Sequence, residues 1–95
     1  MKKIEATLKP VDLEGVRQAL ADEGVWSLLA LQATCLGEKF STRRVHRGSS
    51  YVVDSMPFIR LEVVVADDQV DRIVGVIKAN AGPTLPAEIL VIQVE

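Results

Sequence analysis

The chain has few cysteines and few aromatic side chains, and each shortage excludes a class of protein. A single cysteine, Cys35, cannot form an internal disulfide, so this is not a small disulfide-stabilised scaffold. Only 4% of the 95 residues are aromatic, and Phe58 stands alone at the start of a strand-like run. RNA-recognition modules stack bases on several aromatic side chains of such a strand, so we expect no nucleic-acid partner.

A long apolar run and a strong charge of one sign are also missing. No stretch of about twenty apolar residues could cross a bilayer and no cleavable leader is recognisable, so we expect a soluble cytoplasmic protein without membrane insertion. The formal net charge of -2 gives no general attraction to nucleic acid or anionic lipid. A length of 95 residues leaves room for one domain.

Combinations of residues that signal catalysis or metal binding are absent from the sequence. No nucleophile stands beside a base, and no paired carboxylates share a turn. The single histidine, His46, has no cysteine or second histidine at ligand spacing. The sequence therefore predicts a protein that is not an enzyme, needs no cofactor and holds no metal site within one chain.

Along the chain, apolar residues recur either every two residues, which is typical of strands, or about every 3.6 residues, which is typical of helices. It predicts a strand ended by Pro10, a helix from Asp12 to Gly24, a strand at 58–65, a helix capped by Asp67 or Asp68 and ended by Gly82 and Pro83, and a strand at 89–94. Leucines in 25–36 favour a helix there. Trp26 is expected to close an edge of the core.

If the 25–36 segment is a strand, the order becomes β-α-β-β-α-β, with two helices on one face of an antiparallel sheet. The other face would then carry a mixed set of side chains that could be wet or could form an oligomer interface. These are Glu5, Thr7, Arg60, Glu62 and Val64.

A polar segment follows the doubtful strand and contains four basic groups within five positions, which are Arg43, Arg44, His46 and Arg47. Neighbouring like charges repel one another unless something pairs them. The cluster could therefore grip an acidic partner, a phosphate or bicarbonate, or it could be an ordinary solvated loop face.

Several segments, in order, resemble the PII signal-transduction proteins. They are Met1-Lys2-Lys3-Ile4-Glu5-Ala6, Lys9-Pro10, Val16-Arg17-Gln18-Ala19-Leu20, Arg47-Gly48 with Tyr51-Val52-Val53-Asp54, and Glu62-Val63-Val64-Val65 before Asp67-Asp68. The resemblance implies an α+β, ferredoxin-like βαββαβ sandwich that assembles as a homotrimer. It implies one PII-like domain over 1–95, with a large loop at about 37–55 between strands two and three, and it makes 25–36 a strand.

The resemblance also implies a non-catalytic sensor. PII proteins bind adenine nucleotides in clefts between subunits, and their large loop regulates a membrane transporter or a metabolic enzyme. Arg47 matches the arginine that some members insert into ammonium channels, and Tyr51 matches a tyrosine that is uridylylated in some bacteria. Arg43 and Arg44 belong to the same partner-binding loop. Gly37, Lys39, Glu62 and Val64 fall at positions that bind nucleotide.

Departures from the family pattern lie at the phosphate-binding positions. The family run Gly-Arg-Gln-Lys-Gly is replaced by Gly37-Glu38-Lys39-Phe40-Ser41, and Pro83-Thr84-Leu85-Pro86-Ala87-Glu88 replaces a glycine turn. Proline removes a backbone donor that such a turn would offer to phosphate. The sequence also ends before the family's C-terminal arginines. We therefore expect ADP, AMP or ATP without the usual magnesium site; the alternative is a regulator that responds to bicarbonate or binds its partner constitutively.

Overall fold

The computed structural model describes residues 1–36, 42–46, 49–53, 55–81 and 89–94. Four strands form the main sheet: β1 (Lys2–Leu8), β2 (Leu29–Leu36), β5 (Ser55–Val65) and β6 (Ile89–Gln93). Two helices, α1 (Leu13–Asp22) and α2 (Val70–Asn80), connect them. Each helix follows a short 3-10 turn, at Pro10–Asp12 and at Asp67–Gln69.

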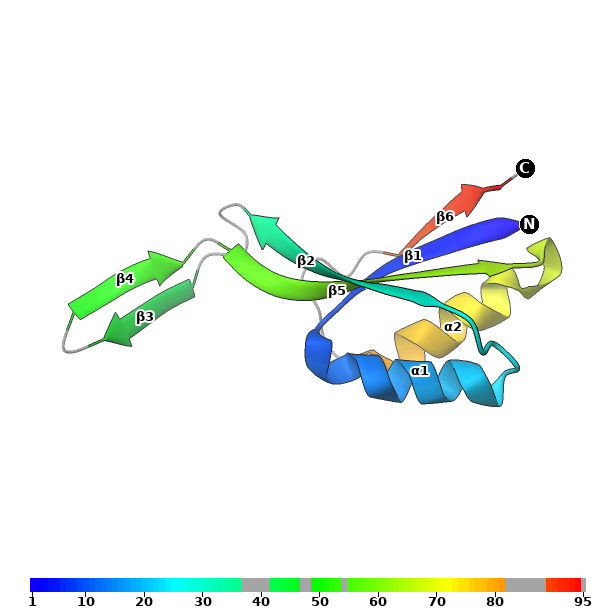
Figure 1. Cartoon of the computed structure of the whole chain (residues 1–95), viewed down its shortest axis with the longest axis horizontal. Helices are drawn as coiled ribbons and strands as arrows, with labels where there is room; N and C mark the ends of the chain where they lie inside the picture. The colour runs from blue at the N-terminus through cyan, green and yellow to red at the C-terminus, as the bar shows by residue number, and fades with distance from the viewer. Residues whose placement is uncertain (37–41, 47–48, 54, 82–88, 95) are drawn as a thin grey trace.

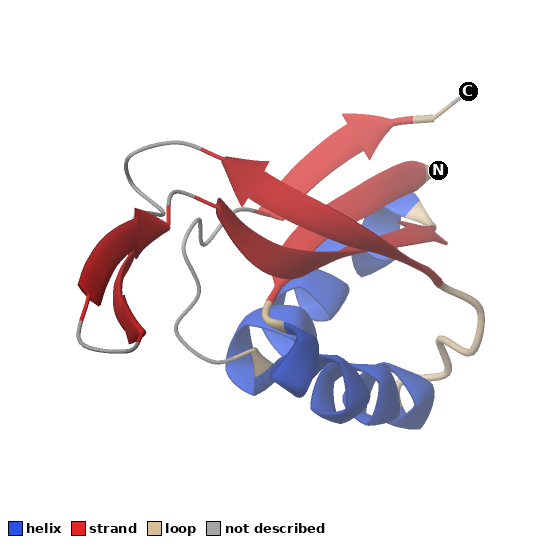
Figure 2. Cartoon of the chain, turned by 60° about the vertical axis from the view of Figure 1, so that its left-hand side comes forward, coloured by secondary structure: helices blue, strands red, loops and turns tan. Residues whose placement is uncertain are grey.

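The main sheet has the strand order β2-β5-β1-β6, and its neighbouring strands are antiparallel. Consequently β1 and β2 run parallel with β5 between them, and β5 and β6 run parallel with β1 between them. Each pair is joined by a helix, and right-handed crossovers of this kind place both helices on the same face. Figures 1 and 2 show α1 and α2 side by side beneath the sheet. The predicted α+β, ferredoxin-like fold is confirmed.

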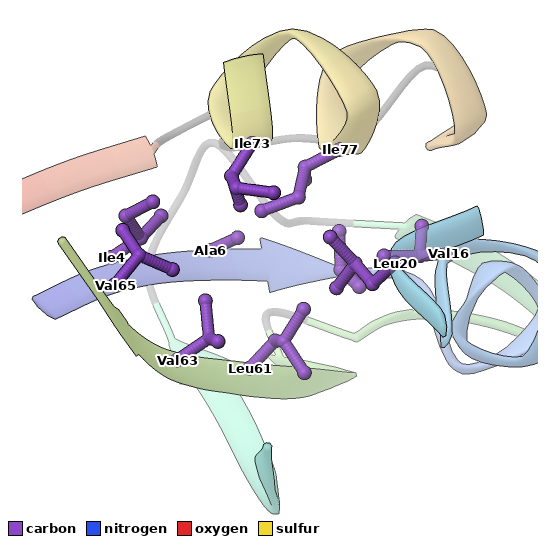
Figure 3. Packing of buried hydrophobic residues seen from close by; sticks show 10 residues of the cluster. Ile4, Ala6, Val16, Leu20, Leu61, Val63, Val65, Ile73 and Ile77 are labelled. Atoms are coloured by element: carbon purple, nitrogen blue, oxygen red, sulfur yellow. The ribbon is translucent and has the colours of Figure 1, made fainter. Parts of the chain in front are cut away.

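The core lies between the helices and one face of the sheet. Its fully buried side chains alternate along β1 and β5 and recur at helical spacing on α1 and α2 (Figure 3). They are Ile4, Ala6 and Leu8, Leu61, Val63 and Val65, Val16 and Leu20, and Ile73 and Ile77. The predicted apolar faces of the two helices therefore meet the predicted apolar face of the sheet.

The 25–36 segment contains β2, as the family resemblance implied and against its local helical propensity. All eight residues of β2 pair with β5, from Leu29 opposite Glu62 to Leu36 opposite Ser55. Backbone pairing along a full strand outweighs the helical preference of leucine, which amounts to a few tenths of a kcal/mol per residue.

Two local expectations are wrong. Neither Asp67 nor Asp68 caps α2, because both lie in the preceding 3-10 turn, and Gln69 occupies the N-cap position. Asp67 instead forms an ion pair with the N-terminal ammonium of Met1, at a nitrogen-to-oxygen distance of 2.8 Å. Trp26 does not close the core, because it is 79% exposed beyond the end of α1.

The segment expected as a large loop at 37–55 is not loop throughout. It contains β3 (Thr42–His46) and β4 (Ser49–Val53), which pair with each other as a separate two-stranded sheet. Ser55 already belongs to β5. Strand-forming residues such as Val45, Tyr51 and Val52 account for the pairing. Figure 1 shows this hairpin beyond the ends of β2 and β5, at one end of a molecule 53 Å long.

Candidate functional site

The sheet face opposite the helices carries an ordered set of side chains, which we call the open face. One row crosses all four strands in register, with Leu29 on β2, Glu62 on β5, Glu5 on β1 and Leu90 on β6. Two carboxylates thus lie side by side at the centre, and a leucine stands at each edge. Like charges in directly opposed positions repel each other, so this row requires neighbouring cations.

Two basic side chains of the open face supply those cations. The Lys3 ammonium lies 3.2 Å from a carboxylate oxygen of Glu5 and 3.7 Å from one of Glu62. The Arg60 guanidinium lies 3.3 Å from Glu5. The hydrogen bond to Glu5, and then the charge of Glu62, raise the pKa of Lys3 above its usual value of 10.5. The four residues form a charge-balanced cluster.

Apolar side chains surround this cluster on the open face. Strand register places the outward-facing residues of β2 and β6 on the same side as Glu5 and Glu62. With Val64 of β5, five apolar residues of this face are between 40% and 52% exposed; they are Leu29, Leu31, Val64, Leu90 and Ile92. Several exposed apolar side chains gathered on one face are typical of a surface that another protein covers.

The structure brings together two of the four predicted nucleotide-binding residues. Glu62 and Val64 are two positions apart on β5, so both lie on the open face. The Glu62 side chain is 21% exposed and Val64 is 49% exposed, so both are accessible to a ligand. Gly37 and Lys39, and the 83–88 segment that replaces the family's glycine turn, lie outside the described residues.

Three of the four predicted partner-binding residues fall on the hairpin. Arg43 and Arg44 are on β3 and Tyr51 is on β4, with Arg44 directly opposite Tyr51 and Arg43 opposite Val52. Arg47 lies outside the described residues. Because the hairpin belongs to a sheet of its own, these positions are separate from the open face.

Two features of the described structure were missed by sequence reasoning. Lys3 was not predicted as a site residue, although its i, i+2 spacing to Glu5 on a strand is a signal for a same-face ion pair. A groove of about 90 Å³ was also missed; it is lined by Arg17, Gln18, Ala21, Val25, Trp26 and Leu28. Exposure of Trp26 cannot be read from its apolar character.

Neither a cluster of metal ligands nor a membrane-spanning helix occurs in the described ranges. No group of three or more histidine, cysteine, aspartate and glutamate side chains could hold a metal ion among those residues. Neither helix described there is long and apolar enough to cross a membrane.

Known proteins match this chain over its whole length. A family model described as nitrogen regulatory protein P-II matches residues 1–95. The nitrogen regulatory protein P-II of Pasteurella multocida is 36% identical over 97 residues, which covers 100% of this chain and 87% of the relative. The Haemophilus influenzae protein is 37% identical over the same coverage. Nitrogen regulatory protein P-II 1 of Escherichia coli K12 is 38% identical over 81 residues, which covers 85% of this chain and 72% of the relative.

Proposed function

Because this chain belongs to the nitrogen regulatory protein P-II family, whose members are regulatory and non-catalytic, we propose that it is a cytoplasmic signalling regulator that senses an adenine nucleotide. The nucleotide, AMP, ADP or ATP, binds between subunits of a homotrimer. The chain acts as one domain over 1–95, and its 37–55 segment contacts a membrane transporter or a metabolic enzyme. The observation that carries the proposal is the open face, where Glu62 and Val64 lie within an apolar margin.

Assembly is supported by the composition of the open face. Exposed Leu29, Leu31, Leu90 and Ile92 lie on the two edge strands, and packing against another copy would remove them from water. Burial contributes roughly 25 cal/mol per Å² of apolar surface. The charged cluster between these edge strands carries no net charge within one chain, so packing of the edges against another copy does not bring a net charge to the interface.

Adenine recognition is supported by the chemistry of Glu62 and Val64. An ionised carboxylate only accepts hydrogen bonds, and the exocyclic amino group of adenine donates them. Val64, two positions along on the same face, offers apolar contact to a flat ring. A site that reads the base and the ribose more than the phosphates suits the proline-containing 83–88 segment.

Partner binding is assigned to the hairpin and the residues around it. Arg43, Arg44 and Arg47 would meet acidic groups on the transporter or enzyme, and Tyr51 is a candidate for covalent modification. Nucleotide binding would act by favouring one arrangement of the 37–55 segment, since only a difference in affinity between two states can shift their populations.

Isothermal titration calorimetry tests the sensing role. The protein is titrated with AMP, ADP, ATP and bicarbonate, with and without magnesium. We expect heat from at least one adenine nucleotide, little dependence on magnesium, and affinity reduced about tenfold or more in Glu62→Ala, since a hydrogen bond to a charged group contributes about 1.5–3 kcal/mol. Absence of binding heat with all three nucleotides would overturn nucleotide sensing. Heat from bicarbonate alone would support the alternative, a regulator that responds to bicarbonate.

A further inference from the structure

The two carboxylates at the centre of the open face, Glu5 and Glu62, make unequal contacts with the neighbouring basic side chains. Glu5 receives Lys3 at 3.2 Å and Arg60 at 3.3 Å, and its side chain is 12% exposed. Among the described residues, Glu62 has only the looser contact with Lys3, at 3.7 Å, and its side chain is 21% exposed. Hydrogen bonds between nitrogen and oxygen are usually 2.7–3.2 Å, so the Lys3 contact leaves the acceptor sites of Glu62 open. Of the two carboxylates, Glu62 is therefore the one free to accept from a ligand.

Lys3 also determines where Glu62 can lie. Within the described ranges, Lys3 carries the one basic group within 4.0 Å of the Glu62 carboxylate. Glu5 is the direct cross-strand partner of Glu62, so without Lys3 the two carboxylates would repel each other across about 5 Å. Arg60 contacts Glu5 and therefore relieves this repulsion only in part. Glu62 would then turn away from Glu5 and lose its fixed position.

We propose that Lys3 is a positioning residue that holds the Glu62 carboxylate for the base and so sets a preference for 6-aminopurine over 6-oxopurine nucleotides. The inference rests on the proposed nucleotide function. An amino group at C6 donates a hydrogen bond to a fixed carboxylate, whereas an oxo group at C6 places an acceptor against another acceptor. A carboxylate that is held in place rejects the oxo base, and one that can turn away tolerates it.

The test compares AMP with IMP, in which an oxo group replaces the amino group at C6 and the neighbouring N1 carries a proton. Affinities are measured by calorimetry for wild type, Lys3→Met and Lys3→Arg. Lys2→Met is the matched control, because Lys2 is adjacent on β1 and pairs with Gln93 instead of Glu62. Circular dichroism and sedimentation establish that each variant keeps the fold and assembly of wild type.

We expect wild type to prefer AMP over IMP by about tenfold or more, as one charge-assisted hydrogen bond allows. Lys3→Met should bring the ratio of the two affinities close to one, while Lys3→Arg and Lys2→Met keep it. A general structural role for Lys3 would weaken both ligands equally and leave the ratio unchanged, which overturns the inference while nucleotide sensing stands. Wild type that binds neither nucleotide overturns the sensing role and this inference together.

The ion pair itself can be tested without a nucleotide. The pKa of Lys3 is measured by NMR titration of its side chain in wild type and in Glu62→Gln. Because the Glu62 charge contributes to raising the pKa of Lys3, we expect that pKa to fall in the variant. An unchanged pKa would show that Lys3 does not hold Glu62 and would contradict the positioning role.

Discussion

At the residue scale, Gly24 shows how one position ends a helix and sets the direction of the next segment. It has a φ of 85° just beyond α1, and its N–H donates to the Ala21 carbonyl at 2.9 Å. The next N–H, of Val25, donates to the Leu20 carbonyl at 2.8 Å. This pattern satisfies carbonyls that the helix end leaves free. The chain then leaves the helix in the direction of β2.

Alanine substitution of two glycines should give effects of opposite sign. In the part of the chain that the structure describes, a Cβ at Gly24 or at Gly75 would meet no atom within 4 Å, so neither change causes a clash there. Gly24→Ala should cost about 1 kcal/mol because of the positive φ. Gly75→Ala, within the helix α2, should stabilise by about 0.5–1 kcal/mol. Urea unfolding measures both, and destabilisation by Gly75→Ala would contradict the assignment.

Because of the ion pair between the Met1 ammonium and Asp67, we expect the stability of the fold to depend on pH in the acidic range. A hydrogen bond from the ammonium, 2.8 Å away, lowers the pKa of Asp67 below its usual 3.8. A carboxyl group whose pKa is lowered on folding stabilises the fold when the pH is above its pKa in the unfolded chain. This stabilisation is lost as the pH falls through its pKa in the folded protein. We expect NMR titration to place the Asp67 pKa below 3.8. N-terminal acetylation should raise it; no change would contradict the pairing.

At the element scale, sequence periodicity predicted the elements whose buried and exposed sides differ. Alternation in β1 and β5, and the i, i+3, i+4 pattern of α2, each identify a face that packs in the core. β2 lacks this contrast, because it is an edge strand on which Leu29, Leu31 and Leu36 are all exposed. Only pairing with β5, a contact distant in sequence, makes it a strand.

The hairpin formed by β3 and β4 should be dispensable for folding. It shares no sheet with the main body, and a two-stranded hairpin alone is marginally stable. Replacing 42–53 with a short Gly-Ser linker should change the free energy of unfolding by less than about 1 kcal/mol, since loop closure depends weakly on length. Guanidinium unfolding measures this change. A loss of about 3 kcal/mol would show that the hairpin packs on the body.

At the scale of the whole molecule, the site was only partly predictable. Glu62 and Val64 were placed by family resemblance, and alternation along β5 put both on the face away from the helices. The role of Lys3 and the apolar margin from β2 and β6 depend on strand order and register. Those are tertiary facts that no local pattern in the sequence contains.

Assembly through the open face is expected to be sensitive to a charge at its edge. Leu90→Glu places an unpaired carboxylate on β6 within the proposed interface, and burying an unpaired charge is costly. Val11→Glu is the control, because Val11 is 82% exposed on the 3-10 turn before α1, outside the open face. At equal concentration, sedimentation velocity should show dissociation of Leu90→Glu alone. Equal behaviour of the two variants would argue against this interface.

The most direct measurement of the central claim is the mass of the wild-type protein by sedimentation equilibrium. A regulator whose ligand sites lie between subunits requires more than one copy of this chain. We predict a species of three times the 10.4 kDa chain mass, stable over a wide range of concentrations. A single species of 10.4 kDa would leave the open face uncovered and would contradict the account.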